Sequence, residues 1–299
     1  MAEKKKILII GGDSFIANFF LGRFKPKYDI TLVSRVSTNA ENEVIQQDLF
    51  SIDANLFKQQ NVVINFAAIV HKGNAVDEDN YIKVNYNLPS MLGKIAKENG
   101  VSQFIQMSSI AVYGKKTVID IDTPEMPVNI YGKSKLMADN ELLSLQDSHF
   151  GATIIRPPMI YGGGNAPGNM MKIIRLAKKR VPLPFKNVDN KRDFINVHNL
   201  TCFIGNVIDN GITGKCLICD QESVSTSELV KIIGESINEK ILQFSMPIFL
   251  ISILKKVSPN IFDKLYSSLK IIPNHIIDSP KKTVSDGISE MIEYLKSEH

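Results

Sequence analysis

The chain has 299 residues, of which 44% are hydrophobic and 22% charged; this ordinary globular usage excludes a disordered, collagenous or coiled-coil protein. Thirty-five Lys and Arg against 31 Asp and Glu leave a net charge of +4, too small an excess to predict a nucleic-acid-binding surface. Three cysteines in this length favour a reducing compartment over a disulfide framework, so we expect a cytoplasmic protein.

No apolar run reaches the roughly 18 residues of a membrane-spanning helix, and the N-terminus lacks the apolar core of a signal peptide. The longest apolar stretch, Ile241–Leu254, is interrupted by polar residues and a proline and is followed by Lys255-Lys256. We interpret it as a buried or lid helix, with docking on a membrane surface as the alternative. Cys216 and Cys219 have CxxC spacing, but no second pair completes a metal site, so an ordinary core strand is favoured.

The first half alternates short apolar runs with helical patterns. Strands are predicted at Lys6–Ile10, Asp29–Val33, Val62–Phe66, Gln103–Met107 and Ala152–Ile155. Helices are predicted between them at Phe15–Phe24, Tyr81–Glu98 and Tyr131–Leu145. Strands that are apolar throughout are buried on both faces, which is typical of a parallel sheet. The repeated βα units therefore predict an α/β fold, a doubly wound sheet of the Rossmann type.

After about Arg156, proline and glycine clusters predict long loops. Helices are predicted at Asn169–Lys179, Ser227–Ser236 (with Thr226 or Ser227 as cap), Ile248–Val257 and Ser285–Lys296. We expect residues 1–160 to form a dinucleotide-binding domain, to which the chain returns around 193–220. Residues 161–299 are expected to form mainly a small C-terminal substrate-binding lobe.

The first strand leads into the turn Gly11-Gly-Asp-Ser14 and the helix start Phe15-Ile16-Ala17. A diphosphate binds well at such a helix N-terminus, because free N–H groups and the helix dipole favour negative charge. The usual GxxGxxG spacing holds with Gly11, Ser14 and Ala17, so two glycines have become the next smallest residues. The turn therefore predicts a dinucleotide site formed by Gly11, Ser14, Phe15 and Ile16, with a plain βα turn as the alternative.

The end of the second strand decides the type of cofactor. A carboxylate there would bind ribose hydroxyls, but the strand ends in Ser34-Arg35, and a guanidinium suits a 2′-phosphate. We therefore expect NADP(H) in preference to NAD(H); the alternative is that Arg35 is a solvated cation or stacks on adenine. Asp48, beside Leu49, is placed at the adenine amino group. Small residues in Phe66-Ala67-Ala68 allow the backbone to line the ribose.

Tyr131 and Lys135 lie four residues apart in a predicted helix, so their side chains share a face. A nearby ammonium, together with a positively charged nicotinamide, favours the phenolate and lowers the pKa of the tyrosine from its usual value near 10. Such a phenol can exchange a proton with a carbonyl or alcohol oxygen. Ser109, just beyond the fifth strand, is expected to bond the same oxygen, with Ser108 as the fallback.

The order of these motifs resembles the extended short-chain dehydrogenases/reductases of the nucleotide-sugar epimerase/dehydratase/reductase group. The motifs are the Gly-rich turn, Asn65-Phe-Ala-Ala68, Ser108-Ser109-x-x-Val-Tyr113-Gly114, Tyr131-x-x-x-Lys135, Arg156-Pro-Pro-x-x-Tyr161-Gly162 and Lys191-Arg192-Asp-Phe-Ile-Asn-Val197. The resemblance covers about residues 6–235. It implies that Tyr131 is the acid/base, that Lys135 holds the ribose and that Ser109 orients the substrate oxygen.

The resemblance also assigns binding residues. It places Pro157 at the carboxamide and Asn85 near the nicotinamide pocket. It places the nucleotide of the sugar at Asn169, Leu183, Phe185 and Arg192, with His71 as a candidate for the sugar itself. A guanidinium pairs well with phosphate; for Arg192 the alternative is an ion pair with Asp189 or Asp193. No metal ligand set is expected.

Dehydratases of this group need an acid/base pair directly after the catalytic hydroxyl, but Ile110 and Ala111 follow Ser109, so dehydration is disfavoured. We expect reduction of a 4-keto group on a nucleotide-activated, UDP-linked deoxy-hexosamine, because Arg156–Leu200 resembles bacterial 4-reductases of surface-polysaccharide synthesis. The alternatives are a 4-epimerase with retained NAD and a non-catalytic dinucleotide-binding sensor or assembly protein.

Relatives dimerise through the helix that carries the tyrosine. On that helix, Leu136, Leu142 and Leu143 are compatible with such a homodimer and equally with packing on the sheet.

Overall fold

The computed structural model describes residues 3–70, 77–276 and 282–297. These divide into two compact units. The first contains residues 1–115, 121–156 and 201–217, and the second contains residues 116–120, 157–200 and 218–299. Among the described residues, no helix is both long and apolar enough to cross a bilayer.

A seven-stranded sheet forms the middle of the first unit, in the order β10-β7-β5-β4-β1-β2-β3. Every pairing between neighbouring strands is parallel, which confirms the predicted doubly wound fold. The strands are β1 (Lys6–Ile10), β2 (Asp29–Ser34), β3 (Glu43–Ile45), β4 (Val62–Asn65), β5 (Gln103–Met107), β7 (Gly151–Arg156) and β10 (Gly214–Leu217). The chain order reverses between β1 and β4, where a doubly wound sheet binds its ligand beyond the strand ends.

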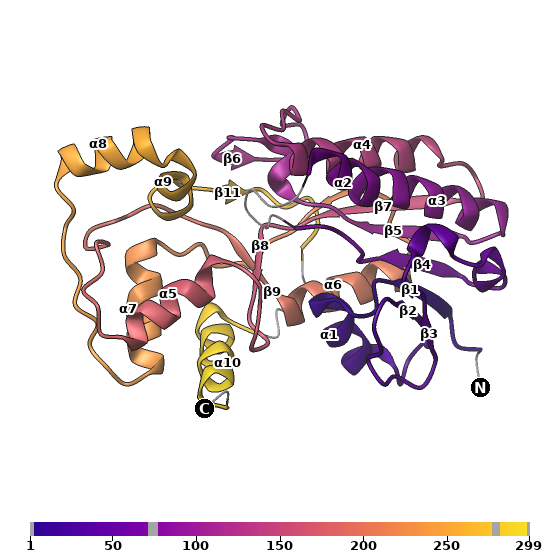
Figure 1. The fold of residues 1–299 in the computed structure, drawn as a ribbon, viewed down its shortest axis with the longest axis horizontal. Coiled ribbons are helices and arrows are strands. Elements are labelled where there is room, and N and C mark those ends of the chain that lie inside the picture. Colours follow the sequence, from indigo (N-terminus) through magenta and orange to yellow (C-terminus); the bar gives the residue numbers. More distant parts are fainter. Residues whose placement is uncertain (1–2, 71–76, 277–281, 298–299) are drawn as a thin grey trace. The chain divides into compact units, whose positions relative to one another are not determined.

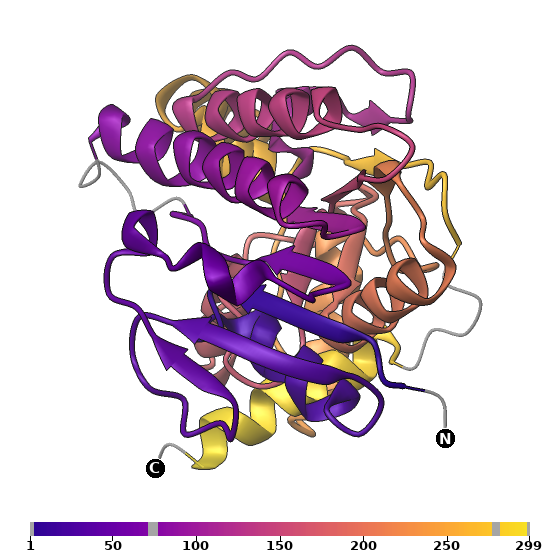
Figure 2. The ribbon, with the colours of Figure 1, turned by 90° about the vertical axis from the view of Figure 1, so that its right-hand side faces the viewer.

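Helices cover both faces of this sheet (Figures 1 and 2). On one face lie α2 (Glu78–Ile82), α3 (Leu88–Glu98) and α4 (Ile130–Ser144), and on the other lie α1 (Phe15–Phe24) and α6 (Val197–Asn210). Short 3₁₀ helices are η1 (Leu49–Ser51), η2 (Ala54–Phe57) and η5 (Ile110–Tyr113). The predicted helix Tyr81–Glu98 differs in one respect, because the π-helical segment η4 (Lys83–Asn87) interrupts it.

The core of the first unit lies between the sheet and α3. Leu8, Val63 and Phe104 from the strands pack with Leu92 of α3 and Leu142 of α4, all of them fully buried. Leu143 packs against the same cluster. These two leucines of α4 therefore contribute to the sheet-facing core, as packing on the sheet requires.

The second unit consists of short strand pairs and helices. Its strands pair in parallel as β8 (Met159–Tyr161) with β9 (Phe194–Asn196) and β6 (Val118–Ile119) with β11 (Lys270–Ile271). Its helices are α5 (Asn169–Lys178), α7 (Thr226–Ser236), α8 (Ile248–Val257), α9 (Pro259–Leu265) and α10 (Val284–Ser297). The sequence pattern did not predict α6, α9 or any of these short strands.

Two sequence predictions in this unit need correction. The cap of α7 is Ser225, not Thr226 or Ser227, because the Ser225 hydroxyl accepts from the Glu228 N–H at 3.0 Å while the Glu228 carboxylate accepts from the Ser225 N–H at 2.6 Å. This reciprocal pair is a capping box. The apolar helix α8 is not buried: none of its residues is fully removed from solvent, and two of them, Ile251 and Leu254, are half-buried.

Candidate active site

The turn after β1 brings three strand ends together. The N–H groups of Gly11 and Gly12 donate to the Val33 carbonyl of β2 at 2.9 and 3.0 Å. Gly11 has φ +80°, and a Cβ on it would lie 2.6 Å from the Ala67 nitrogen after β4. Only glycine tolerates both that backbone conformation and that approach. The predicted cofactor residues Gly11, Phe66 and Ala67 therefore lie together at the point where the strand order reverses.

Ser14 caps helix α1. Its hydroxyl accepts from the Ala17 N–H at 3.2 Å, so the serine that replaces a family glycine satisfies one first-turn donor. The N–H groups of Phe15 and Ile16 lie in the same turn, where an α-helix offers no internal acceptor. The close backbone approach at Gly11 and these N–H groups fit the diphosphate of a dinucleotide.

Arg35 follows β2 and turns back toward the Gly-rich loop. Its guanidinium lies 3.2 Å from the Asp13 carboxylate, and its side chain is 65% exposed. A carboxylate that the sequence pattern missed lies nearby: Glu43 of β3 pairs in register with Leu32 of β2. Hydrogen bonds from the segment at Thr38 lower the pKa of Glu43 to about 2. The Arg35 guanidinium therefore has an acidic partner, Asp13, even without a bound phosphate.

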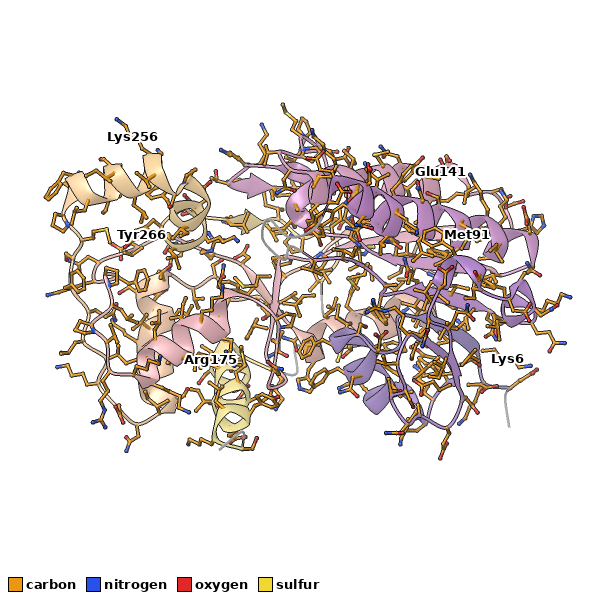
Figure 3. All side chains as sticks on the ribbon, in the orientation of Figure 1. Lys6, Met91, Glu141, Arg175, Lys256 and Tyr266 are labelled. Carbon is orange, nitrogen blue, oxygen red and sulfur yellow. The ribbon has the colours of Figure 1, made fainter. Side chains whose placement is uncertain are left out.

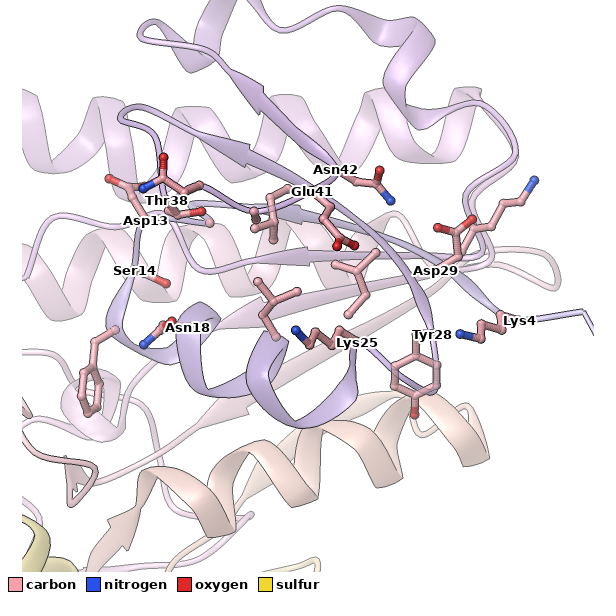
Figure 4. Close-up of a pocket in the computed structure, with 18 of the residues that line it drawn as sticks. Lys4, Asp13, Ser14, Asn18, Lys25, Tyr28, Asp29, Thr38, Glu41 and Asn42 are labelled. Carbon is pink, nitrogen blue, oxygen red and sulfur yellow. The ribbon is translucent and has the colours of Figure 1, made fainter.

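An open pocket of about 890 Å³ lies along the outer side of α1 and β2 (Figure 4). Asp13 and Ser14 line one end, Lys25 and Tyr28 the other, and Glu41 one side. Ser14 and Phe15 are the predicted cofactor residues that it includes, while the predicted catalytic residues do not line it. The pocket therefore reaches the Gly-rich loop but is not the catalytic centre.

The other predicted cofactor residues shape the loops around the strand ends. Asp48 caps η1, because its carboxylate accepts from the Phe50 N–H and the Ser51 hydroxyl, both at 3.1 Å, and Leu49 lies in the core. Asn85 is fully buried in η4 and clamps the loop after β4. Its side chain accepts from the Ile69 N–H at 2.9 Å and donates to the Ile69 carbonyl at 3.0 Å. His71 lies outside the described residues.

The predicted catalytic residues converge beyond the end of β5. Ser109 caps η5, where its hydroxyl accepts from the Ala111 N–H at 3.2 Å, and its side chain is close enough to the Tyr131 phenol to lower the pKa of that phenol. Tyr131 lies in the first turn of α4, with its ring edge-on to the ring of Tyr81 at 6.4 Å between centroids. Lys135, one turn later, is buried and donates from Nζ to the Met107 carbonyl at 2.9 Å. The hydroxyl and the phenol therefore lie near one another, and the ammonium is anchored to the end of β5.

The charges of this site differ from the sequence expectation. Burial raises the pKa of Tyr131 to about 12, although the hydrogen bond from Ser109 opposes that shift. Burial also lowers the pKa of Lys135 to about 8. In the chain by itself the pKa of Tyr131 is raised, because desolvation outweighs the contribution that lowers it. The lowering expected from Lys135 together with a positively charged nicotinamide stays a prediction for the protein with its cofactor.

A buried ionic network that the sequence analysis missed holds this site. The Asp139 carboxylate, four residues after Lys135 on α4, accepts from the Ser108 hydroxyl at 2.8 Å and from Nε of Arg156 at 2.9 Å. Asp139 and Arg156 are both fully buried. Arg156 also donates from Nη1 to the Tyr113 hydroxyl and to Glu125, each at 2.8 Å. The i, i+4 spacing from Lys135 was the available sequence signal.

Of the residues predicted to bind the nucleotide of the sugar, Phe185 and Arg192 contact α9 or the residues that follow it. The buried ring of Phe185 lies 5.9 Å from the Tyr266 ring. Nη1 of Arg192 donates to the carbonyls of Asp263 and Ser267 at 2.8 and 2.7 Å, rather than to Asp189 or Asp193. Leu183 is buried and forms a backbone bridge to Gln243. Asn169 begins α5, and Pro157 follows β7.

The cysteines show no reactive character. Burial raises the pKa of the Cys216 and Cys219 thiols to about 12 in both cases. Within the described ranges, no group of three or more His, Cys, Asp or Glu side chains could hold a metal ion.

We predict that replacing Lys135 changes the pH dependence of stability. Between the folded pKa near 8 and the ordinary value of 10.5, the unfolded chain binds a proton that the folded chain has lost, so wild-type stability gains with rising pH. Lys135→Met removes this gain. The free energy of unfolding of the wild type minus that of Lys135→Met should therefore rise by on the order of 3 kcal/mol between about pH 7 and about pH 10.5. Urea unfolding across that range measures it; parallel curves for the two proteins would contradict the shift.

Removing Asp139 should strongly destabilise the first unit. Asp139→Ala leaves Arg156 and Lys135 buried without their shared carboxylate, which costs about 3–5 kcal/mol for a broken buried pair. Glu141 lies on the outer side of the same helix (Figure 3) and pairs with Lys94 at 2.7 Å, partly exposed. Glu141→Ala is therefore the matched control, expected to cost less than about 1 kcal/mol. Equal costs in urea unfolding would refute the central role of Asp139.

Comparison with known proteins agrees with this geometry. Residues 7–215 match the NAD dependent epimerase/dehydratase family. The chain is 28% identical to a UDP-glucose 4-epimerase of Vibrio cholerae, over 96% of this chain and 94% of that protein. It is 26% identical to the N-acetyl-alpha-D-glucosaminyl-diphospho-ditrans,octacis-undecaprenol 4-epimerase of Escherichia coli O157:H7, over 81% of this chain and 75% of that one.

Solved structures share the fold. A UDP-N-acetylglucosamine 4-epimerase of Methanobrevibacter ruminantium superposes with a TM-score of 0.81 at 19% identity, over all of both chains. A UDP-glucuronic acid 4-epimerase of Bacillus cereus, solved in complex with NAD, gives 0.79 at 18% identity, over 98% of this chain and 99% of that one. The motif order, the doubly wound sheet and the family match agree, and the chain belongs to the NAD dependent epimerase/dehydratase family of enzymes that act on nucleotide sugars.

Proposed function

We propose that this protein inverts C4 of a UDP-linked sugar, with Tyr131 as its acid/base. The observation that carries the proposal is the placement of the Ser109 side chain, at the start of η5, near the Tyr131 phenol in the first turn of α4, with Lys135 one turn later on that helix. The 4-epimerases among its relatives support this reaction over the 4-keto reduction expected from sequence. The apolar residues Ile110 and Ala111, which follow Ser109 in η5, disfavour dehydration.

A nicotinamide dinucleotide held at the Gly-rich turn supplies reversible hydride transfer at C4. Tyr131 accepts the proton of the C4 hydroxyl as a 4-keto sugar forms and returns it when the opposite epimer forms. Ser109 donates a hydrogen bond to the same sugar oxygen and keeps it beside the phenol. Lys135 keeps positive charge close to the phenol, which favours proton acceptance.

The remaining predicted residues bind the two ligands in this proposal. Backbone groups at Gly11, Ser14, Phe15 and Ile16 hold the diphosphate, and the clamped loop after β4 holds the ribose. The other assignments to the dinucleotide are Arg35, Asp48, Leu49, Phe66, Ala67, Ala68, Asn85 and Pro157. The nucleotide of the sugar is assigned to Asn169, Leu183, Phe185 and Arg192.

Tyr131→Phe tests the reaction. The variant keeps the ring packing against Tyr81 but loses the transferable proton, so kcat should fall by about 10²–10⁴-fold. Tyr86→Phe, in the neighbouring helical segment η4, is the matched control and should retain activity. The assay follows interconversion of UDP-glucose with UDP-galactose, and of their N-acetyl forms, by proton NMR. Full activity of Tyr131→Phe would remove the basis of the proposal.

A second candidate, 4-keto reduction with NADPH, is favoured by Arg35 and by Ser34 at the end of β2. The pairing of the Arg35 guanidinium with the Asp13 carboxylate opposes a preference for NADPH, because the guanidinium already has an acidic partner. Epimerisation predicts NAD released from the purified protein on denaturation and no net NADPH consumption. Reduction predicts NADPH consumption with 4-keto-6-deoxy-hexosamine nucleotides, weakened in Arg35→Ala while use of NADH is unchanged. Dinucleotide binding without turnover of either substrate class would instead favour the non-catalytic sensor or assembly protein.

A further inference from the structure

Helix α8 of the second unit is mostly apolar, and eight of its ten residues are exposed. Its sequence is Ile-Phe-Leu-Ile-Ser-Ile-Leu-Lys-Lys-Val, and none of these ten residues is buried. Ile248 is 82% exposed, Phe249 64% and Val257 76%. Exposed apolar surface of this kind marks an interaction site, because a lone soluble protein gains nothing from it.

The exposed side chains form a continuous stripe. Phe249, Ile253 and Val257 follow one another at four-residue spacing, which places them on one face of the helix, and Leu250 adjoins them. Ile251 and Leu254 are the half-buried residues of the helix. In the flanking segments, Leu242, Phe244 and Ile261 are also each at least 46% exposed.

Helix α9 supports α8 from one side. The two helices are consecutive and lie beside one another (Figure 1). The Lys255 ammonium lies 5.5 Å from the ring centroid of Phe262, and that ring stacks on Tyr266 at 5.8 Å. The contacts of α9 thus hold α8 in place while the apolar stripe stays exposed.

The sequence segment that contains the stripe carries an excess of positive charge. Residues 240–270 contain five lysines and one aspartate, a net charge of +4 that equals the net charge of the entire chain. The rest of the sequence is therefore neutral. Lys255 and Lys256 lie in the last turn of α8, and the Lys256 side chain extends away from the ribbon (Figure 3). An apolar stripe bordered by lysines complements a bilayer with anionic headgroups.

We propose that α8 is an interfacial anchor that lies in the headgroup region of an anionic membrane and inserts Phe249, Ile253 and Val257. Ten residues span about 15 Å, half of the bilayer core of about 30 Å, so the helix lies in the interface. A second copy of the chain is a poorer occupant. A second copy brings the same excess of lysines in this segment, whereas an anionic surface complements that charge. The proposal is independent of the reaction assigned to the protein.

A single-tryptophan variant tests the insertion directly. The chain contains no tryptophan, so Phe249→Trp of the full chain reports on that position alone. Its fluorescence should shift to the blue with phosphatidylcholine vesicles that contain phosphatidylglycerol, and brominated acyl chains should quench it. Met137→Trp is the control, because Met137 is 40% exposed on α4 of the other unit and should show neither effect. Phe249→Trp that stays unshifted in the folded protein overturns the proposal.

Co-sedimentation with the same vesicles separates the apolar and charged contributions. Phe249→Ser with Ile253→Ser should lower binding at least about tenfold. Lys255→Glu with Lys256→Glu should lower it by about fivefold or more per lysine, and Lys231→Glu with Lys296→Glu, elsewhere in the unit, should lower it far less. Thermal unfolding confirms that each variant is folded. Equal binding to pure phosphatidylcholine, or sedimentation velocity showing that Phe249 and Ile253 mediate self-association instead, overturns the anchor.

Discussion

The buried carboxylate of Asp139 is the interaction on which the candidate site depends. It joins α4 to the segment after β5 through Ser108 and to the end of β7 through Arg156. The helix that carries Tyr131 and Lys135 is therefore held to two strand ends by charge-assisted hydrogen bonds. Such bonds are strong and directional in a low-dielectric interior. A small shift of α4 would break them, so the phenol is held in position.

The same burial that strengthens these bonds sets the charges of the site. An ammonium without water is costly, which is why the pKa of Lys135 falls, and a phenolate without water is costly too, which is why the pKa of Tyr131 rises. Asp139 raises the pKa of both groups. It therefore helps to keep Lys135 charged and opposes ionisation of Tyr131. The chain alone therefore holds the tyrosine in its protonated form, and the proton acceptance proposed for Tyr131 would require the positive charge of a bound nicotinamide to lower that pKa.

Local pattern predicted the elements that are long and periodic. The helix Phe15–Phe24 and the strand Lys6–Ile10 have the predicted bounds, because Ser14 caps the helix and the apolar run Ile7–Ile10 defines the strand. The short strand pairs of the second unit were not predicted, since two or three residues carry no period. Helix α6 follows β9 without a break, so no turn residue marked its start.

The residues of the candidate site also fall into two groups, those that the sequence indicated and those that only the tertiary structure revealed. Motif spacing indicated Tyr131 and Lys135, because spacing along one helix determines which side chains share a face. Ser109 was indicated by its position just beyond the fifth strand. The roles of Asp139 and Glu125 required the tertiary structure, since a carboxylate in sequence does not show whether it will be buried beside a guanidinium from another strand.

The sequence by itself determined the parallel sheet, the Gly-rich turn and the positions of the catalytic motifs, because these depend on local conformational preference and on periodic hydrophobicity. Only the tertiary structure decided which charges are buried, the direction of the pKa shifts and the exposure of α8. These properties depend on how much water each group keeps once distant segments have packed together, and that quantity is not encoded in any local pattern.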